Sequence, residues 1–392
     1  MRTVLEVDGL FDGTNTMSDA AIVIDGGEIA WVGKRSRAPK TPKGERSRTV
    51  EAATSFVVPG MVNAHAHLTV DGSANFDAEI RQSDTMATVK AFKNARSAMR
   101  AGITTVRDLG AAGTMVIELA RAIESGVVEG PHIVAAGRGI TTTGGHGFEV
   151  GRICDSADEV RKGIREQIVS GAQVIKLFST GGVLGGGAPP DVSQYSLAET
   201  RAAVEEAHKA GLKITTHAHG AEGMRFAAEA GIDSIEHATL LDTATLRVIK
   251  DHGTTLIPTF CALRSILDNA DKLPPIVVER SRSVTDKHRE GMRAAHKMGI
   301  RIAAGTDAGT PFNRHERFAR ELGYLVEVGL SKEEAITAAT RIAADVIGMP
   351  KAGRIAAGAH ADLVFVDGDP TRDVELVLTP KAVWMRGVPV AP

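Results

Sequence analysis

Short apolar runs alternate with amphipathic stretches through the middle of the chain. Glycine repeatedly stands just past an amphipathic stretch and before the next apolar run, as in Ala101-Gly102 and Ala210-Gly211, which is typical of a helix that ends before a strand. Strands that alternate with helices in this way favour a parallel sheet. We expect eight strands, at residues 57–65, 103–107, 133–136, 174–178, 213–217, 234–237, 254–258 and 301–306, with helices at 83–100, 155–170, 196–210, 221–230 and 276–298. This pattern predicts a (β/α)8 barrel.

The two ends of the chain have a different pattern. Residues 20–24 and 28–33 are apolar runs on either side of the turn Asp25-Gly26-Gly27, which predicts a β-hairpin. Strand-like runs return at 361–366 and 382–385. Neither end is large enough to bury a core alone, so we expect the two to pair. The predicted fold is α/β, with a TIM barrel at residues 59–346 and a small composite β-sandwich domain built from residues 1–58 and 347–392.

Composition narrows the classes of partner and compartment. The 392 residues carry a formal net charge of −2, which leaves no basic field for nucleic acid or an anionic membrane. No apolar run reaches membrane-spanning length. Small molecules or peptides are the expected partners. Cys154 and Cys261 are too few for a disulfide framework, and we expect the cytoplasm as the compartment.

Metal-ligand residue types stand at the ends of several expected strands. In a (β/α)8 barrel the C-terminal ends of the strands meet at one mouth, where catalytic groups lie. His65 and His67 close the first strand, and side chains two apart on a strand point to the same face. The fifth, sixth and eighth strands end at His217, His237 and Asp307. Imidazoles and a carboxylate at one barrel mouth predict a zinc-type metal site.

Lys176 lies within the otherwise apolar strand Val174-Ile175-Lys176-Leu177-Phe178. Burial of an ammonium group is costly unless the group is paired or neutralised. One interpretation is an ion pair with a carboxylate of the barrel. The other is a neutral amine that reacts with carbon dioxide to give a carbamate, whose oxygens can bridge two metal ions. The residues alone leave both open.

Taken together, these segments resemble the amidohydrolase superfamily over essentially the whole chain. Within it the chain is most similar to the branch of Xaa-Pro dipeptidases, other L-amino-acid dipeptidases and arginine/lysine carboxypeptidase-like enzymes. Imidazolonepropionase resembles the chain less, because that enzyme uses one metal ion and lacks the lysine. The matching segments are Pro59-Gly60-Met61-Val62-Asn63-Ala64-His65-Ala66-His67, Thr143-Gly144-Gly145-His146-Gly147, Val174-Ile175-Lys176, Thr216-His217-Ala218-His219-Gly220, Ser234-Ile235-Glu236-His237, Ala304-Gly305-Thr306-Asp307 and Gly358-Ala359-His360-Ala361-Asp362-Leu363-Val364.

The resemblance implies two divalent metal ions, for which we expect zinc. His65, His67 and Asp307 would bind the first ion, and His217 and His237 the second. Lys176, as N6-carboxylysine, would bridge the two ions. Asp307 would serve as general base for the attacking water and as acid for the departing amine. His146 would contact the carbonyl or carboxylate of the substrate, and His219 and Tyr195 are further candidates for substrate contact or for support of the ligands.

The expected function is hydrolysis of amide C–N bonds by a binuclear metal enzyme, with a dipeptide or an N-acyl amino acid as substrate. One alternative is hydrolysis of a cyclic amide, carbamate or urea, and another is a catalytically silent binding scaffold. The resemblance also favours a homo-oligomer. We expect the glycine-rich segment 181–187 to form a lid or substrate loop, since it lacks the lysine of a phosphate loop. We expect Arg107 and Asp108 to form a structural ion pair.

Overall fold

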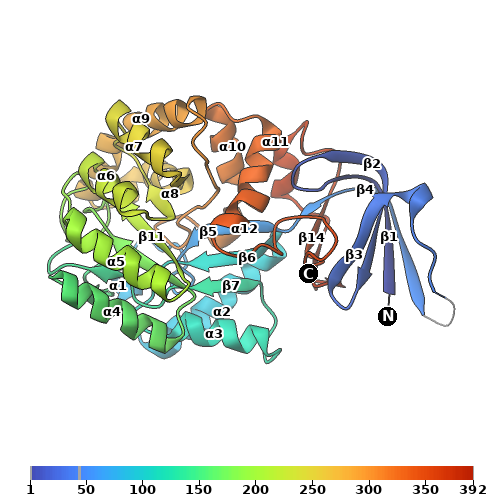
Figure 1. Ribbon diagram of the computed structural model, residues 1–392, viewed down its shortest axis with the longest axis horizontal. Coiled ribbons are helices and arrows are strands. Elements are labelled where there is room, and N and C mark those ends of the chain that lie inside the picture. The colour runs from blue at the N-terminus through green and yellow to red at the C-terminus, as the bar shows by residue number, and fades with distance from the viewer. Residues whose placement is uncertain (1, 43–45, 392) are drawn as a thin grey trace.

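The computed structural model describes residues 2–42 and 46–391, and Figure 1 shows a helix-covered barrel with a sheet at one side. That sheet contains strands from both ends of the chain, in the order β16-β15-β14-β4-β1-β2-β3. Its strands are β1 (Arg2–Phe11), β2 (Thr16–Asp25), β3 (Glu28–Lys34), β4 (Ser47–Pro59), β14 (Leu363–Val366), β15 (Ala382–Met385) and β16 (Val388–Pro389). The antiparallel pairing of β14 with β4 joins the two ends, with Val364 opposite Val58. The predicted pairing of the termini is therefore confirmed.

The barrel strands pair in parallel and lie close to where the sequence predicts them. They are β5 (Met61–Ala66), β6 (Ile103–Asp108), β7 (His132–Ala135), β10 (Val174–Phe178), β11 (Lys213–Ala218), β12 (Ser234–His237) and β13 (Thr255–Ile257), with the short strands β8 (Ile140–Thr141) and β9 (Arg152–Ile153) beside β10. The first three form one sheet and the others a second. The barrel class predicted from the sequence is confirmed.

The eighth expected strand, 301–306, is not regular. The segment still closes the barrel, because Leu256 N–H donates to the Arg301 carbonyl at 3.0 Å and Ala64 N–H donates to the Ala304 carbonyl at 3.1 Å. Further along, the N–H groups of Thr306 and Asp307 both donate to the His65 carbonyl, at 3.2 and 2.8 Å. Two donors on one acceptor interrupt the regular ladder, and Asp307 has a φ of 58°.

Most of the helices cover the outside of the barrel (Figure 1). Ser83, Ser156 and Ser196 begin three of them by accepting a backbone N–H, as short polar residues do at helix starts. The helices are α1 (Phe76–Ile80), α2 (Asp84–Arg100), α3 (Met115–Glu124), α4 (Ala157–Ser170), α5 (Leu197–Lys209), α6 (Ala221–Ala230), α7 (Thr243–His252), α8 (Phe260–Leu267), α9 (Pro275–Lys297), α10 (Arg320–Glu327), α11 (Lys332–Thr337) and α12 (Ala343–Val346). Short turns of other helix types are η1 (Arg35–Arg37), η2 (Ala270–Lys272), η3 (His315–Arg317), η4 (Ala338–Ile342) and η5 (Val374–Leu378).

The connection from the terminal sheet to the barrel is a single residue. Gly60 lies between β4 and β5, and its N–H donates to the Asp362 carbonyl at 2.8 Å. A Cβ on Gly60 would stand 2.0 Å from Oγ1 of Thr104, so only glycine fits there. Nε2 of His132 lies 2.9 Å from Oδ2 of Asp362, which ties β7 to β14. The strand that ends near His65 and His67 is thus fixed at its start by the terminal sheet. The domain boundaries given above stay a prediction.

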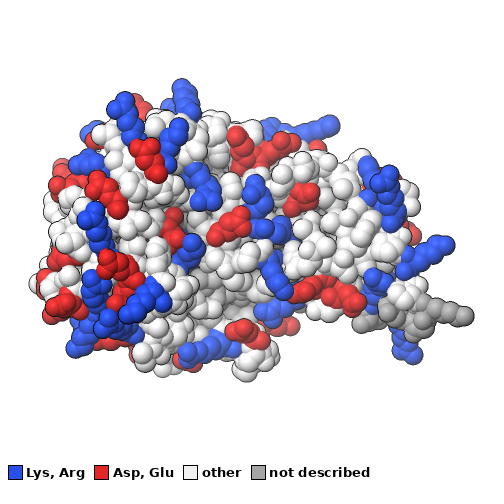
Figure 2. All heavy atoms as spheres, viewed as in Figure 1, with Lys and Arg blue, Asp and Glu red and all other residues white. Residues whose placement is uncertain are grey.

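Lys and Arg side chains alternate with Asp and Glu side chains over the face shown in Figure 2, and neither sign dominates that view. Within the described ranges, no helix combines the length and apolar character needed to cross a bilayer.

Candidate metal centre

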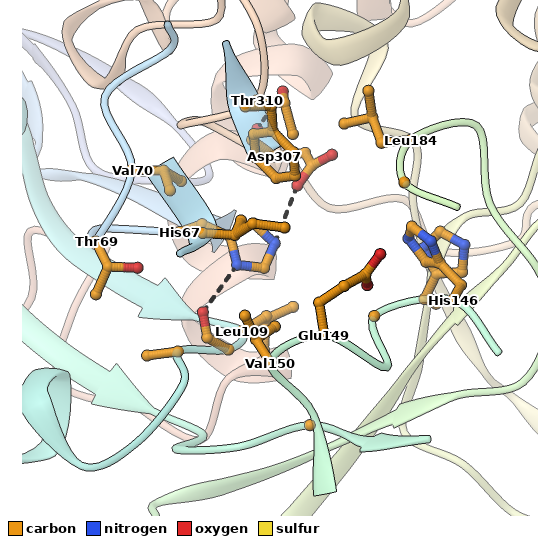
Figure 3. A pocket seen from close by; sticks show the side chains of 18 of the residues that line it. His67, Thr69, Val70, Leu109, His146, Glu149, Val150, Leu184, Asp307 and Thr310 are labelled. Atoms are coloured by element: carbon orange, nitrogen blue, oxygen red, sulfur yellow. Dashed lines mark hydrogen bonds and ion pairs between the residues drawn. The ribbon is translucent and has the colours of Figure 1, made fainter. Parts of the chain in front are cut away.

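The first cluster of ligand-type side chains joins β5 to the segment that closes the barrel. Nε2 of His65 lies 3.3 Å from Oδ1 of Asp307, and Nε2 of His67 lies 3.2 Å from the same oxygen. The three ligand atoms lie within 4.8 Å of one another. Figure 3 shows His67 and Asp307 side by side at the cavity. Asp307 is held in the left-handed backbone region, a conformation that non-glycine residues seldom adopt outside constrained or functional sites.

The other ring nitrogen of each histidine in this cluster lies close to an oxygen atom. Nδ1 of His65 lies 2.8 Å from Oε2 of Glu236, and Nδ1 of His67 lies 3.1 Å from the Gly110 carbonyl. Both Nε2 atoms therefore face Asp307. Histidines that bind metals are usually oriented by such a partner on the second nitrogen, so this geometry fits a bound ion.

Glu236 is itself held by Arg107, not left free in the barrel. NH2 of Arg107 lies 2.7 Å from Oε1 of Glu236, and both side chains are fully buried. Although burial raises the pKa of Glu236, Arg107 and His65 hold it at about 2. The expected ion pair of Arg107 with Asp108 is wrong. Asp108 instead accepts the N–H of Leu68 at 2.6 Å, because its side chain turns toward the loop after β5.

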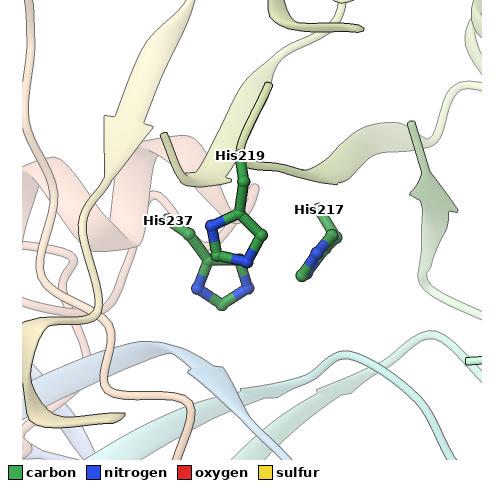
Figure 4. A group of neighbouring side chains, drawn as sticks. All are labelled: His217, His219 and His237. Atoms are coloured by element: carbon green, nitrogen blue, oxygen red, sulfur yellow. The ribbon is translucent and has the colours of Figure 1, made fainter. Parts of the chain in front are cut away.

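The second cluster consists of three imidazoles, His217, His219 and His237 (Figure 4). His217 and His237 were expected together, and the structure adds His219, with ring centres 4.6 Å from His217 and 4.9 Å from His237. Nε2 of His219 is buried and has no hydrogen-bond partner among the described residues. A buried ring nitrogen without a partner is costly, so a ligand or metal ion fits there. Each ring also has one nitrogen within hydrogen-bond distance of an oxygen atom outside the cluster. These pairs are His217 Nε2 and the Gly181 carbonyl at 3.1 Å, His219 Nδ1 and Thr239 Oγ1 at 2.9 Å, and His237 Nδ1 and Thr259 Oγ1 at 2.6 Å.

Burial sets the charge of these imidazoles. It lowers the pKa of His65 to about 4 and that of His219 to about 3, and it lowers those of His217 and His237 well below the usual value. The pKa of His67 is raised, because Asp307 outweighs the opposing effect of burial. Neutral imidazole is the form that binds a metal ion, so four of the five rings are already in that form near pH 7.

Lys176 is buried in β10 and lines the same cavity as the two clusters. Burial lowers the pKa of its amine to about 8, against the opposing effects of Glu236 and Asp307. Its Nζ lies 5.2 Å from the ring centre of Phe178. No carboxylate in the described part of the chain lies within ion-pair distance of Nζ, so the ion-pair interpretation is not what the structure shows.

A cavity of about 130 Å³ lies over both clusters. Its walls are mainly apolar and include Phe178, together with Leu109, Val150 and Leu184, which Figure 3 labels. No arginine of the described chain lines it. Lys176, His146 and both histidine clusters lie at its polar part, which is the arrangement of few polar groups on an apolar wall that small-molecule sites have.

Of the three residues predicted to contact the substrate, His146 and His219 line the cavity and Tyr195 does not. His146 lines the cavity, its ring centre is 4.3 Å from that of His217, and burial lowers its pKa to about 4. His219 also lines the cavity. Tyr195 is not among the residues that line the cavity in the described part of the chain. Its hydroxyl donates to the Cys154 carbonyl at 3.0 Å and its ring is buried in the core, so its position favours a structural role.

The glycine-rich segment 181–187 lies beside the cavity, which its Leu184 and Gly185 help to line. NH1 of Arg280 donates to the carbonyls of Gly182 and Gly187 at 3.3 and 3.4 Å. A Cβ on Gly182 would stand 2.5 Å from the His146 ring. The segment therefore packs directly on His146, which explains why glycine is needed there.

Comparison with known proteins identifies the family and several similar proteins. The model of the amidohydrolase family matches residues 56–390. An ochratoxinase of Aspergillus niger is 30% identical over 410 residues, which cover 95% of this chain and 82% of that enzyme. A Xaa-Pro dipeptidase solved with methionine in its active site has 31% identity and a TM-score of 0.92, with full coverage of both chains. A prolidase in complex with N-methylphosphonate-L-proline has 29% identity and a TM-score of 0.91, with 100% and 99% coverage.

Proposed function

The chain belongs to the amidohydrolase family as a metal-dependent hydrolase, and from that premise we propose that it cleaves the amide bond of dipeptides or N-acyl amino acids at a two-metal centre. The observation that carries the proposal is the convergence of two histidine-containing clusters on one cavity, which the buried Lys176 also lines. The similarity to a Xaa-Pro dipeptidase and to a prolidase with a proline-based ligand supports this substrate class. The catalytically silent scaffold has no such support.

The residues present fit two divalent ions. His65, His67 and Asp307 would hold one ion, and His217 and His237 the other. Lys176 would bridge them as a carbamate, since an amine with a pKa lowered to about 8 loses its proton readily enough to react with carbon dioxide. Ions at these positions supply Lewis-acid activation of the scissile carbonyl and of water, and imidazole and carboxylate ligands suit zinc.

Asp307 is the residue best placed to move protons. Despite its burial, His65 and His67 hold the pKa of its carboxylate below the usual range, so it is ionised and able to accept a proton from water. The same carboxyl group can then donate that proton to the departing amine. Its Oδ1 faces the two ring nitrogens while the cavity lies in front of it (Figure 3).

His146 and His219 would orient the substrate. Both rings are neutral near pH 7 because burial lowers their pKa, and a neutral ring can donate one hydrogen bond to a carbonyl or carboxylate oxygen. The apolar walls exclude water from the reacting bond, which strengthens these polar contacts.

A second candidate is hydrolysis of a cyclic amide, carbamate or urea. The observation that favours it is the cavity wall without an arginine in the described chain, since arginine is the side chain that binds a carboxylate most specifically. Such substrates present the same carbonyl without a free carboxylate.

A substrate panel separates these candidates. The zinc-loaded chain would be assayed against Xaa-Pro and Xaa-Arg/Lys dipeptides, N-acyl amino acids, an imidazolone, a carbamate and an arylurea. We expect turnover of the dipeptides or N-acyl amino acids, and turnover confined to the last three would overturn the proposal in favour of the second candidate. A homo-oligomer and a cytoplasmic location remain part of the proposal, and light scattering tests the first.

A further inference from the structure

Glu149 brings a carboxylate into the cavity from the loop between β8 and β9. Figure 3 shows its side chain extending toward the space between His67 and His146, with the two carboxylate oxygens at the tip. The residue is half-buried. Its carboxylate therefore faces the region where the substrate would lie, although Glu149 belongs to none of the motifs found in the sequence.

The other acidic side chains around the cavity have partners. Asp307 faces His65 and His67, as described above. Glu79 accepts the N–H of Ser73 at 3.2 Å and forms an ion pair with Lys90. Among the residues that the structure describes, Glu149 has neither a hydrogen bond nor an ion pair. Glu149 is thus the acidic group of the cavity that remains available to a ligand.

The surroundings of Glu149 also favour a cationic partner. The apolar residues Val150 and Leu184 line the same cavity, and no arginine in the described chain lines it. Lys176, the one lysine that lines the cavity in the described part of the chain, lies in the buried strand β10. Gly185 lies beside this carboxylate, since a Cβ there would stand 3.4 Å from Oε1, at ordinary van der Waals distance. A carboxylate beside apolar groups is stabilised when a cation pairs with it.

We propose that Glu149 determines specificity by pairing with a positively charged nitrogen of the substrate. The matching chemistry is a primary ammonium group, which can be the free α-amino group of a dipeptide or the end of a basic side chain. The inference rests on the proposed amide hydrolysis and deepens it. It distinguishes dipeptides from N-acyl amino acids, the two substrate classes of the proposed function, since a dipeptide carries a free α-ammonium group and an N-acyl amino acid does not.

The test compares the zinc-loaded wild-type chain with Glu149→Gln, which keeps the shape and removes the charge. Substrates are Met-Pro, N-acetyl-Met-Pro and N-acetyl-Lys-Pro. If the α-ammonium group is the partner, kcat/KM for Met-Pro falls roughly 10- to 100-fold in the variant, mainly through KM. The acetylated methionine substrate is then unaffected. If the side chain is the partner, the loss appears with N-acetyl-Lys-Pro.

Binding provides a readout apart from turnover. If the α-ammonium group is the partner, calorimetric titration with methionine amide should show weaker binding to Glu149→Gln. If the side-chain ammonium is the partner, the weaker binding should appear with N-acetyllysine, and in both cases N-acetylmethionine should bind both proteins equally. The matched control is Glu118→Gln, which removes an exposed carboxylate of α3 that pairs with Arg121. It should change neither readout.

Equal losses for charged and uncharged ligands, or no loss at all, would overturn the inference. Loss of zinc from Glu149→Gln would also overturn it, because Glu149 would then serve the metal ions. Failure of the wild type to hydrolyse any of the three peptides counts against the proposed function instead, and the titration still decides the role of Glu149.

Discussion

Nδ1 of His65 lies 2.8 Å from Oε2 of Glu236. The other oxygen of this carboxylate meets Arg107, so three buried side chains from β5, β12 and β6 form one chain of contacts across the barrel. The outer end of that chain is the Nε2 atom of His65, which faces Asp307. A metal-ligand candidate is therefore oriented by an ion pair that itself never reaches the cavity.

Glu236→Gln should weaken both the fold and the first metal site. The variant leaves the Arg107 charge buried without its partner, which costs about 3–5 kcal/mol in the free energy of unfolding. It also loosens His65, and loss of such an orienting partner lowers metal affinity about 10- to 100-fold. Urea unfolding and a zinc titration measure the two effects. Glu118→Gln, at an exposed ion pair, should stay within about 0.5 kcal/mol of the wild type. A Glu236→Gln variant with full stability would contradict this account.

Lys176→Met should reduce the bound zinc from two ions to one per chain and abolish turnover. Methionine keeps the volume of the buried side chain but cannot form a carbamate. Elemental analysis counts the ions, and native mass spectrometry should detect the added mass of carbon dioxide in the wild type alone. Lys162→Met, on the exposed face of α4, is the control and should keep both properties. Full activity of Lys176→Met with a single metal ion would refute the bridging role.

Gly305→Ala should disturb the metal centre, whereas Gly323→Ala should not. A Cβ on Gly305 would stand 3.0 Å from the backbone nitrogen and Cβ of His65 and 2.6 Å from Ile257. A Cβ on Gly323, in the helix α10, meets nothing within 4 Å. We expect Gly305→Ala to lose about 1–3 kcal/mol of stability by overpacking and Gly323→Ala to gain about 0.5–1 kcal/mol. Thermal unfolding and zinc content check both, and similar behaviour of the two variants would show that space beside His65 is not limiting.

Glu321 should make the fold less stable as the pH rises toward neutrality. Its two carboxylate oxygens each accept a backbone N–H at 2.8 Å, from Phe260 and Cys261 at the start of α8, yet burial raises its pKa from 4.5 to about 7. Between these values the folded chain holds a proton that the unfolded chain has released. The contribution to stability is therefore complete below pH 4.5 and is lost as the pH rises through about 7.

The rise of the Glu321 pKa from 4.5 to about 7 corresponds to a loss of about 3 kcal/mol in the free energy of unfolding. Glu321→Gln should remove this part of the pH dependence, and urea unfolding of both proteins from pH 4.5 to 7.5 at one zinc concentration measures it. Glu327→Gln, which changes a more exposed carboxylate of α10, should leave the slope unchanged. A wild-type curve parallel to that of Glu321→Gln would contradict the raised pKa.

The barrel and most of its ligand-type residues could be predicted because both follow from local pattern. Apolar runs locate the strands, and the parallel topology then brings strand ends such as His65 and His237 to one mouth. Contacts across the barrel leave no such pattern, so the pairing of Arg107 with Glu236 was missed. The acidic residue directly before His237 in a buried strand was the available signal for it.

Loop residues could not be placed from the sequence for a different reason. Tyr195 and Glu149 both lie in connections after barrel strands, where side-chain direction depends on how the loop folds back. One side chain turns into the core and the other into the cavity. The third imidazole, His219, lies one residue past β11, so strand periodicity alone did not decide whether it joins His217.

The pairing of β4 with β14 also has a consequence for synthesis and truncation. Strands β1 to β4 can associate early, but the other edge of β4 gains its partner only after nearly the whole chain has left the ribosome. Until then the apolar residues Val57 and Val58 lie on an open strand edge, which is a template for aggregation. Loss of the last few dozen residues would therefore harm solubility before it altered any group at the metal centre.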